Sequence, residues 1–191
     1  MPSAFSPFMR QSLRFALLAV WLAPAWGATL EQLSLADMIS KSTAIVHGQV
    51  TGSSAAYRGS VIYTHYRVNV LEQWKGATQS AADVLVPGGV AKGIRQTYPG
   101  APQLNVGQEY VLFLWTSSKG ETYTIGFTQG VFSLPASVSG QVMAVQAPTT
   151  ETMLDPVTGR VVNSQPISMP FSRLVGLITA GVAAAAKPSV R

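Results

Sequence analysis

The fold of this 191-residue chain is decided by the stretch Ile62-Tyr-Thr-His-Tyr-Arg-Val-Asn-Val70. Its side chains alternate with a period of two residues, which predicts a long β-strand with two chemically different faces. The strand is expected to begin after a turn at Arg58-Gly59 and to end near Trp74. One face carries Ile62, Thr64, Tyr66, Val68 and Val70, and the other carries Tyr63, His65, Arg67 and Asn69.

Further strands are predicted on both sides of this stretch. Apolar runs indicate strands at 83–87, 109–115, 122–127, 131–134 and 141–145, whereas residues 88–102 hold too many Gly and Pro for either period. About five to seven strands separated by turns predict a mainly β fold, a small antiparallel barrel or sandwich. The strand over 43–50 would place Ala44, Val46, Gly48 and Val50 on one face, opposite Thr43, His47 and Gln49.

Two helices are expected at the ends of this β region. Residues 28–42 are predicted to form a short helix, in which Ser34 and Asp37 form a capping box. Pro170 precedes an apolar stripe and predicts a C-terminal helix that lies on the domain. Residues 148–169 are a polar extension with one possible hairpin at Asp155–Gly159, and residues 170–191 form the helix and tail. The β domain itself is expected to span residues 28–147.

The first 27 residues have the three parts of a secretory signal peptide. Arg10 and Arg14 precede an apolar run over 15–26, and small residues at Ala25 and Gly27 suit cleavage before Ala28. The run of about a dozen apolar residues is shorter than the roughly 20 that a membrane-spanning helix needs. We therefore expect an exported protein, periplasmic or extracellular, with no stable membrane span after cleavage.

The charge and the absence of cysteine narrow the function further. The net charge of +5 suggests a nucleic-acid partner. Without residues 1–27 the charge falls to +3, and export disfavours that partner. The lack of cysteine excludes disulfide frameworks, iron–sulfur clusters and cysteine nucleophiles. With two histidines and eight acidic residues, no metal ion and no cofactor is expected.

A family resemblance rests on four motifs between residues 36 and 134. They are Ala44-Ile-Val-x-Gly-x-Val50, Leu71-x-x-Trp-Lys-Gly76, Val106-Gly-Gln-Glu-Tyr-Val-Leu-Phe-Leu114 and Gly130-x-Phe132. Their order resembles a group of uncharacterised exported bacterial proteins and, distantly, the netrin-like module of tissue inhibitors of metalloproteinases. The resemblance implies an OB-like five-stranded barrel. Those inhibitors chelate zinc through an N-terminal cysteine, which this chain lacks.

Two surfaces are candidates for ligand binding. The row Tyr63, His65, Arg67 and Asn69 offers aromatic, imidazole, guanidinium and amide groups on one strand face, and OB-type barrels bind ligands on such faces. The loop over 88–102 carries Lys92, Arg95 and Tyr98, and long loops on a rigid scaffold often carry recognition. An ordinary solvated strand face and a plain connector are the alternatives.

No catalytic constellation is predicted. A three-residue loop over Tyr57–Gly59 would place His47 opposite Asn69, too far along the hairpin from His65 for a shared metal. Both histidines are therefore expected to face solvent, and Glu72, Glu109 and Glu121 are interpreted as solubilising strand ends. The sequence favours an exported, non-enzymatic module that binds a protein, peptide or glycan. A secreted metalloprotease inhibitor and a hydrolase of unrecognised type remain alternatives.

Overall fold

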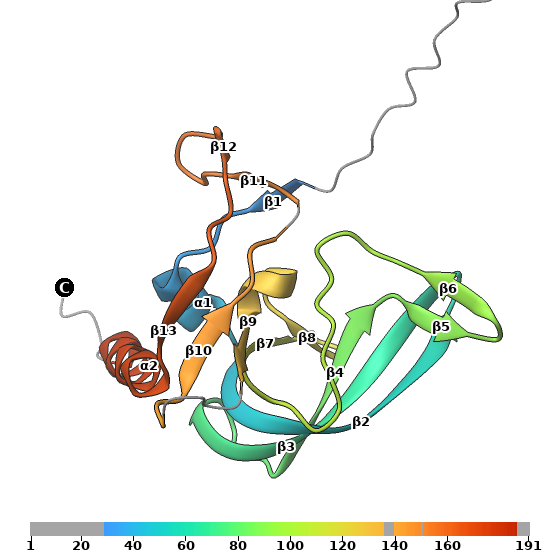
Figure 1. Ribbon diagram of the computed structural model, residues 1–191, viewed down its shortest axis with the longest axis horizontal. Helices are drawn as coiled ribbons and strands as arrows, with labels where there is room; N and C mark the ends of the chain where they lie inside the picture. The colour runs from blue at the N-terminus through green and yellow to red at the C-terminus, as the bar shows by residue number, and fades with distance from the viewer. Residues whose placement is uncertain (1–28, 136–139, 150, 187–191) are drawn as a thin grey trace, which may run out of the picture.

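The computed structural model describes residues 29–135, 140–149 and 151–186, so the predicted signal peptide lies outside it (Figure 1). The helices are α1 (Leu35–Lys41) and α2 (Phe171–Ala185), with a 3₁₀-helix at Phe127–Gly130. The strands are β1 (Thr29–Glu31), β2 (Ala44–Arg58), β3 (Val61–Lys75), β4 (Ala81–Pro87), β5 (Gly89–Ala91), β6 (Ile94–Gln96), β7 (Glu109–Thr116), β8 (Thr122–Thr124), β9 (Val131–Leu134), β10 (Met143–Gln146), β11 (Thr152–Leu154), β12 (Val161–Val162) and β13 (Ile167–Pro170). The prediction of a mainly β chain is confirmed.

The main sheet closes into a ring of five strands. The strand order in this sheet is β13-β10-β9-β7-β2-β3-β4-β8. Because β8 also pairs with β7, the five strands β7, β2, β3, β4 and β8 form a closed ring. Val84 and Leu85 of β4 pair in parallel with Thr122 and Tyr123 of β8, while the other pairs in the ring are antiparallel. The expectation of a purely antiparallel sheet is therefore wrong at this one junction.

The inside of the ring holds the first hydrophobic core. Side chains of even number on β3 and β4 point inward, as the alternation over Ile62–Val70 predicted. Val46, Val50, Val68 and Val84 are buried there together with Tyr66, Tyr110, Leu112 and Leu114. Burying apolar area on this scale is the main driving force for closing the ring.

A second core lies outside the ring, against one part of the sheet. The helices α1 and α2 cover the outer face of β7 and of the first half of β2, beside β10 and β13 (Figure 1). Its members include Met38, Ile39, Ile45, Val111, Phe113, Phe132, Leu174 and Ile178. The first half of β2 is thus buried on both faces, which the period-two pattern did not predict.

His47 lies in this covered region and is buried, with 7% of its surface exposed. Its ring packs edge-on against Phe171 of α2 at a centroid distance of 5.1 Å. Nε2 is 2.9 Å from Glu109, whereas Nδ1 is 4.0 Å from Glu72 and has no hydrogen-bond partner. The prediction of a solvent-facing His47 is wrong because α2 covers this end of the sheet.

The β2–β3 hairpin also differs from its predicted register. Arg58 pairs with Val61, so the turn has two residues instead of three. Register shifts at three points along β2 then place Gln49 opposite Asn69 and His47 opposite Glu72. β-Bulges of this kind add residues to one strand and increase its twist, which helps the two long strands to bend around the ring.

The helices and strands at the two ends of the described chain agree only in part with those predicted from the sequence. The capping box is present, with Asp37 N–H donating to Ser34 Oγ, but residues 29–31 form β1 beside β11 instead of extending the helix. The hairpin β11–β12 turns at Asp155, and α2 begins at Phe171, both as predicted. No described helix has the length and hydropathy of a membrane span. The polar extension contributes β11, β12 and β13.

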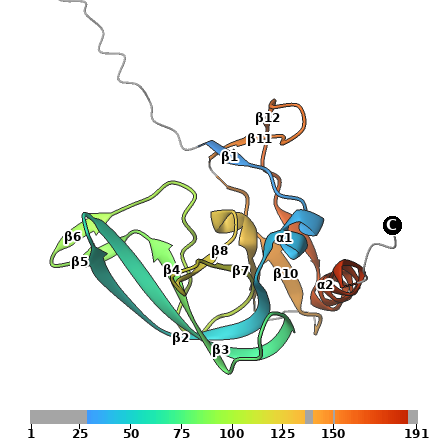
Figure 2. The ribbon, with the colours of Figure 1, turned by 180° about the vertical axis from the view of Figure 1, so that it is seen from behind.

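The loop over 88–102 contains a small hairpin, β5–β6, that the sequence interpretation missed. Gly88 precedes this hairpin with a φ of 104°, and Gly89 begins it with a φ of 133°. A Cβ on Gly89 would collide with Thr64 Oγ1, so the backbone approaches β3 more closely than another residue would allow. Seen from behind, this hairpin lies at the far end of the long β2–β3 ribbon (Figure 2).

Candidate functional site on the outer face of the ring

The outer face of the ring is covered by helices at one end and open at the other. The open part is formed by the second half of β2, the first half of β3, and β4, β8 and β7. Two adjoining hollows lie on this open part, and we refer to them as the aromatic shelf and the polar groove. Tyr63 lines the aromatic shelf, and His65, two residues further along the same face of β3, lines the polar groove.

The aromatic shelf is a cavity of about 310 Å³ with mostly apolar walls. Trp115 and Tyr123 are paired across β7 and β8, and their ring centroids lie 6.2 Å apart. Tyr63 meets Tyr123 edge-on at 6.4 Å, and Trp115 remains 47% exposed. The remaining walls are Leu85, Pro87, Thr124 and Phe127. Exposed aromatic rings in a hollow are a feature of binding sites and interaction surfaces.

A polar network fixes the edge of the shelf. Arg58, at the end of β2, forms a close ion pair with Glu121 and lies 5.9 Å from the centre of the Tyr63 ring. The Tyr123 hydroxyl donates to the same Glu121 carboxylate at 2.6 Å. Two turns far apart in the sequence are thereby joined, since Glu121 follows β7 and Arg58 precedes β3. This network restricts the rotamers of two aromatic side chains that line the shelf.

The network shifts the pKa of each member. The hydrogen bond from Tyr123, followed by that from Arg58, lowers the pKa of Glu121, because both donors favour the ionised carboxylate. The same bond raises the pKa of the Tyr123 hydroxyl, since ionisation would lose the bond and place a second negative charge beside Glu121. Hydrogen bonding to Glu121 also raises the pKa of Arg58. The edge of the shelf therefore holds an ionised glutamate beside a neutral tyrosine at neutral pH.

Replacing Glu121 by glutamine tests this network. The folded-state pKa of Glu121 is lowered, so its contribution to stability is fully present above the ordinary glutamate pKa and is lost as the pH falls through the lower value. We therefore expect the thermal midpoint of the wild type to be higher than that of Glu121→Gln at neutral pH, and the two midpoints to converge in acid. The variant should also titrate Tyr123 at lower pH, as measured by tyrosinate absorbance. Arg160→Gln, an exposed charge change away from the network, is the control, and an unchanged Tyr123 titration in Glu121→Gln would contradict the network.

The polar groove lies beside the shelf and owes its depth to small residues. Gly52, Ser54 and Ala56 of β2 pair with Arg67, His65 and Tyr63 of β3, so short side chains stand beside long ones. His65 Nδ1 is 2.9 Å from Asp83 Oδ2, a residue of β4. Arg67 is exposed and makes no ion pair with a described carboxylate. The groove thus offers an oriented imidazole, a carboxylate and an unpaired guanidinium.

The His65–Asp83 pair has the form of a base and the acid that orients it. Ser54 stands opposite His65, but in the described chain no serine or threonine hydroxyl hydrogen-bonds to the imidazole. A nucleophile–base hydrogen bond is the geometric sign of an activated serine. Within residues 29–135, 140–149 and 151–186, no three His, Asp or Glu side chains gather closely enough to hold a metal ion.

The seven candidate residues from the sequence fall in different places. Tyr63, His65 and Arg67 lie together on the outer face. Arg95 and Tyr98 line a separate cavity at the end of the ring. Asn69 is exposed on β3 but lines neither hollow, and Lys92 lies between β5 and β6 with its ammonium 6.0 Å from the Tyr57 ring centre.

Several residues of the site were missed by the sequence interpretation. Trp115 was predicted only as the last residue of a strand over 109–115, yet it is half exposed near the end of β7 and lines the shelf. Glu121, interpreted as a solubilising strand end, is a structural partner of two site residues. Asp83 was interpreted as a strand-start residue, although it faces His65.

Comparison of the chain with protein-family models, with curated proteins and with solved structures finds no match.

Proposed function

We propose that this protein is an exported, non-enzymatic binding module that recognises a glycan on the outer face of an OB-type barrel. The observation that carries the proposal is the position of the aromatic shelf beside the polar groove, with neighbouring residues of β3 lining the two hollows. Aromatic rings provide flat apolar surfaces on which the apolar faces of sugar rings stack, while hydroxyl groups need polar side chains beside them. Tyr63, Trp115 and Tyr123 supply the first requirement, and His65, Arg67 and Asp83 supply the second.

The strand order supports the OB-type assignment. Numbered along the chain, the ring strands β2, β3, β4, β7 and β8 close in the order first, second, third, fifth, fourth. OB-folds are five-stranded Greek-key barrels that bind oligosaccharides or oligonucleotides across their second and third strands, beside the first and fourth turns. The corresponding strands here are β3 and β4, and the corresponding turns hold Arg58 and Glu121. Export, inferred from the first 27 residues, favours a glycan over a nucleic acid.

The two alternative functions have less support. An inhibitor of the netrin-like type would depart from that family at the zinc-chelating position, because the family uses an N-terminal cysteine and the chain has no cysteine. A hydrolase with a Ser–His–Asp triad would need a serine hydrogen-bonded to His65, and no described hydroxyl forms that bond. Assays against a panel of zinc proteases and against ester and glycoside substrates test them directly, and activity in either assay would contradict the proposal.

The proposal is tested with a glycan array and the double variant Tyr63→Ala/Arg67→Ala. For glycans that bind the wild type, the double variant should bind at least about 10-fold more weakly, because it loses one stacking surface and one charged donor. The thermal midpoint should fall by only a few degrees, since Arg67 is exposed and Tyr63 loses one contact with the Tyr123 ring and one with the Arg58 guanidinium, each worth about 1 kcal/mol.

Leu71→Ala is the matched control for this variant. Leu71 is exposed on the same strand and lines neither hollow, so its replacement should leave glycan binding unchanged. Equal binding by the wild type and the double variant would contradict the assigned site. If no glycan on the array binds and a display library yields binding peptides instead, the ligand of this site is a peptide and the glycan proposal is contradicted.

A further inference from the structure

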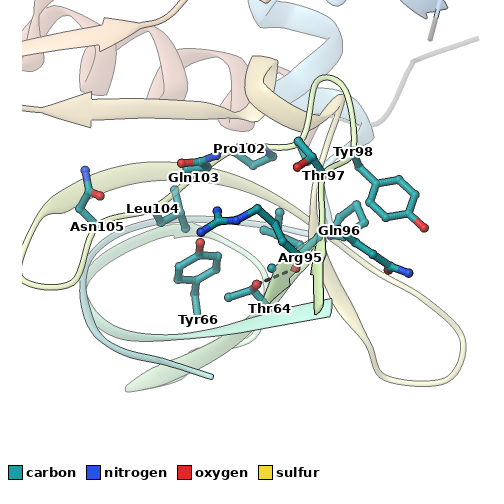
Figure 3. Close-up of a pocket in the computed structure, with 15 residues that line it drawn as sticks. Thr64, Tyr66, Arg95, Gln96, Thr97, Tyr98, Pro102, Gln103, Leu104 and Asn105 are labelled. Atoms are coloured by element: carbon teal, nitrogen blue, oxygen red, sulfur yellow. Dashed lines mark hydrogen bonds between the residues drawn. The ribbon is translucent and has the colours of Figure 1, made fainter. Parts of the chain in front are cut away.

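A further cavity, of about 250 Å³, opens at the end of the ring, away from the outer face (Figure 3). Its floor is formed by inward-facing residues of the ring, including Thr64, Tyr66 and Val86. Its other walls come from the segment that runs from β6 through residues 97–105. Tyr66 and Thr64 belong to the opposite face of β3 from Tyr63 and His65, so the cavity is distinct from the shelf and the groove.

The walls of the cavity are held in place by hydrogen bonds. Gln96 accepts from the Ile62 amide at 2.6 Å and donates to the Ser60 carbonyl at 2.9 Å, which attaches β6 to the beginning of β3. Thr64 Oγ1 donates to the Gly88 carbonyl at 2.7 Å. On the other wall, the backbone N–H of Asn105 donates to the Tyr110 hydroxyl at 3.0 Å. A cavity with anchored walls loses little conformational freedom when a ligand enters.

Among the described residues, Arg95 is the one charged side chain that lines this cavity, and no carboxylate does. Arg95 extends from β6 across the opening in Figure 3, on the side where Tyr66 and Leu104 lie. Within the described residues Arg95 makes no ion pair and no hydrogen bond through its guanidinium. No hydrogen bond to the Tyr66 hydroxyl is formed by the described residues, and Tyr66 as a whole is 8% exposed. The polar side chains Thr97, Gln103 and Asn105 complete the lining.

We propose that this cavity binds a small monocarboxylate of about monosaccharide or single amino-acid size. The planar guanidinium fork matches the two oxygens of a carboxylate, and one positive charge balances one negative charge. A phosphate dianion would leave excess charge in a cavity with a single cation. The hydroxyl of Tyr66 and the amides of Gln103 and Asn105 are available to polar groups on the rest of the ligand. The proposal does not depend on glycan binding at the outer face.

Two pairs of probes test the site by calorimetry and by ligand-observed NMR. D-glucuronate is compared with D-glucose, and N-acetyl-L-alanine is compared with its C-terminal amide, each at up to about 10 mM. We expect at least one carboxylate to bind and its neutral counterpart to bind at least about 10-fold more weakly. Binding of glucuronate alone would indicate a sugar acid, and binding of N-acetyl-L-alanine alone would indicate a peptide end. Both outcomes support the carboxylate site.

Variants separate this site from its surroundings. Arg95→Gln should weaken carboxylate binding at least about 10-fold, and Arg95→Lys should retain part of it, because lysine keeps the charge but loses the fork. Lys92→Gln, on the same hairpin outside the cavity lining, and Tyr63→Ala, on the outer face, should bind as the wild type does. The proposal is overturned if no carboxylate binds, if neutral probes bind equally well, or if Arg95→Gln binds as tightly as the wild type.

Discussion

Leu174→Ala is expected to lower the free energy of unfolding by about 2 to 5 kcal/mol, the usual cost of removing a fully buried leucine side chain from a core. Leu174 has no exposed surface and packs in the second core with Met38, Ile39 and Ile178. The chain beside it has little room to collapse, because a Cβ on Gly181 of α2 would lie 2.8 Å from Ile39 Cδ1. Urea denaturation followed by tryptophan fluorescence measures the loss.

Leu177→Ala is the matched control for this experiment. Leu177 lies one turn along the same helix and is 41% exposed, so the same substitution removes far less buried area. We expect its effect to stay within about 0.5 kcal/mol of the wild type. Equal effects of the two substitutions would mean that α2 does not pack on the sheet in solution. The outer face of β2 would then lie open along its whole length, including His47.

Gly48→Ala is expected to destabilise the protein by about 3 kcal/mol, at the upper end of the cost of overpacking a core. A Cβ at this position would lie 2.5 Å from Val68 Cγ1 and 2.7 Å from the Asn69 carbonyl oxygen. Val68 is fully buried inside the ring, and the carbonyl belongs to the backbone of β3, so neither neighbour can move without shifting the hairpin. A thermal midpoint lower by roughly 6–12 °C is the expected measurement.

Gly52→Ala separates this steric effect from the general cost of changing a glycine. Gly52 lies on the same strand, has no atom within 4 Å of an added Cβ, and has an ordinary backbone conformation. Its replacement should leave the midpoint almost unchanged. A midpoint for Gly48→Ala equal to that of Gly52→Ala would contradict the close approach of β2 and β3. Because Gly52 lines the polar groove, the same variant also reports whether ligand binding tolerates a shallower groove.

The strands and helices were predictable because their signals are local. The alternation over Ile62–Val70 specified which residues face the interior, and the ring contains Val68 and Tyr66 as that pattern requires. The capping box at Ser34 and Asp37 specified where α1 begins, since the two side chains satisfy amides within the same turn. Each of these outcomes depends on residues that are close together in the sequence.

The register of the hairpin was less predictable. A two-residue turn and three shifts along β2 replaced the single uniform register expected from the sequence. Bulges depend on how strongly two strands must twist to close a ring, and this requirement arises from the partners of both strands. The prediction that His47 lies opposite Asn69 was wrong for this reason.

Of the candidate site, only the residues on β3 were predicted from the sequence. Tyr63, His65 and Arg67 share a face by alternation alone, but Trp115, Tyr123 and Glu121 join them through the pairing of β4 with β8 and of β7 with β8. Nothing in the sequence near residue 63 indicates those partners. The parallel pairing of β4 and β8 joins residues about 38 positions apart, so it depends on closure of the ring as a whole.

The sequence by itself determined the mainly β fold, the inward and outward faces of the long strand, and the two helices, because side-chain periodicity and capping act over a few residues. The tertiary structure alone decided which part of the outward face is covered. Helix α2 and strand β13 bury the end with His47 and Ile45, and leave the end with Tyr63 and Arg67 open. The physical reason is that exposure depends on the packing of elements far apart in the chain, which periodicity along one strand does not record.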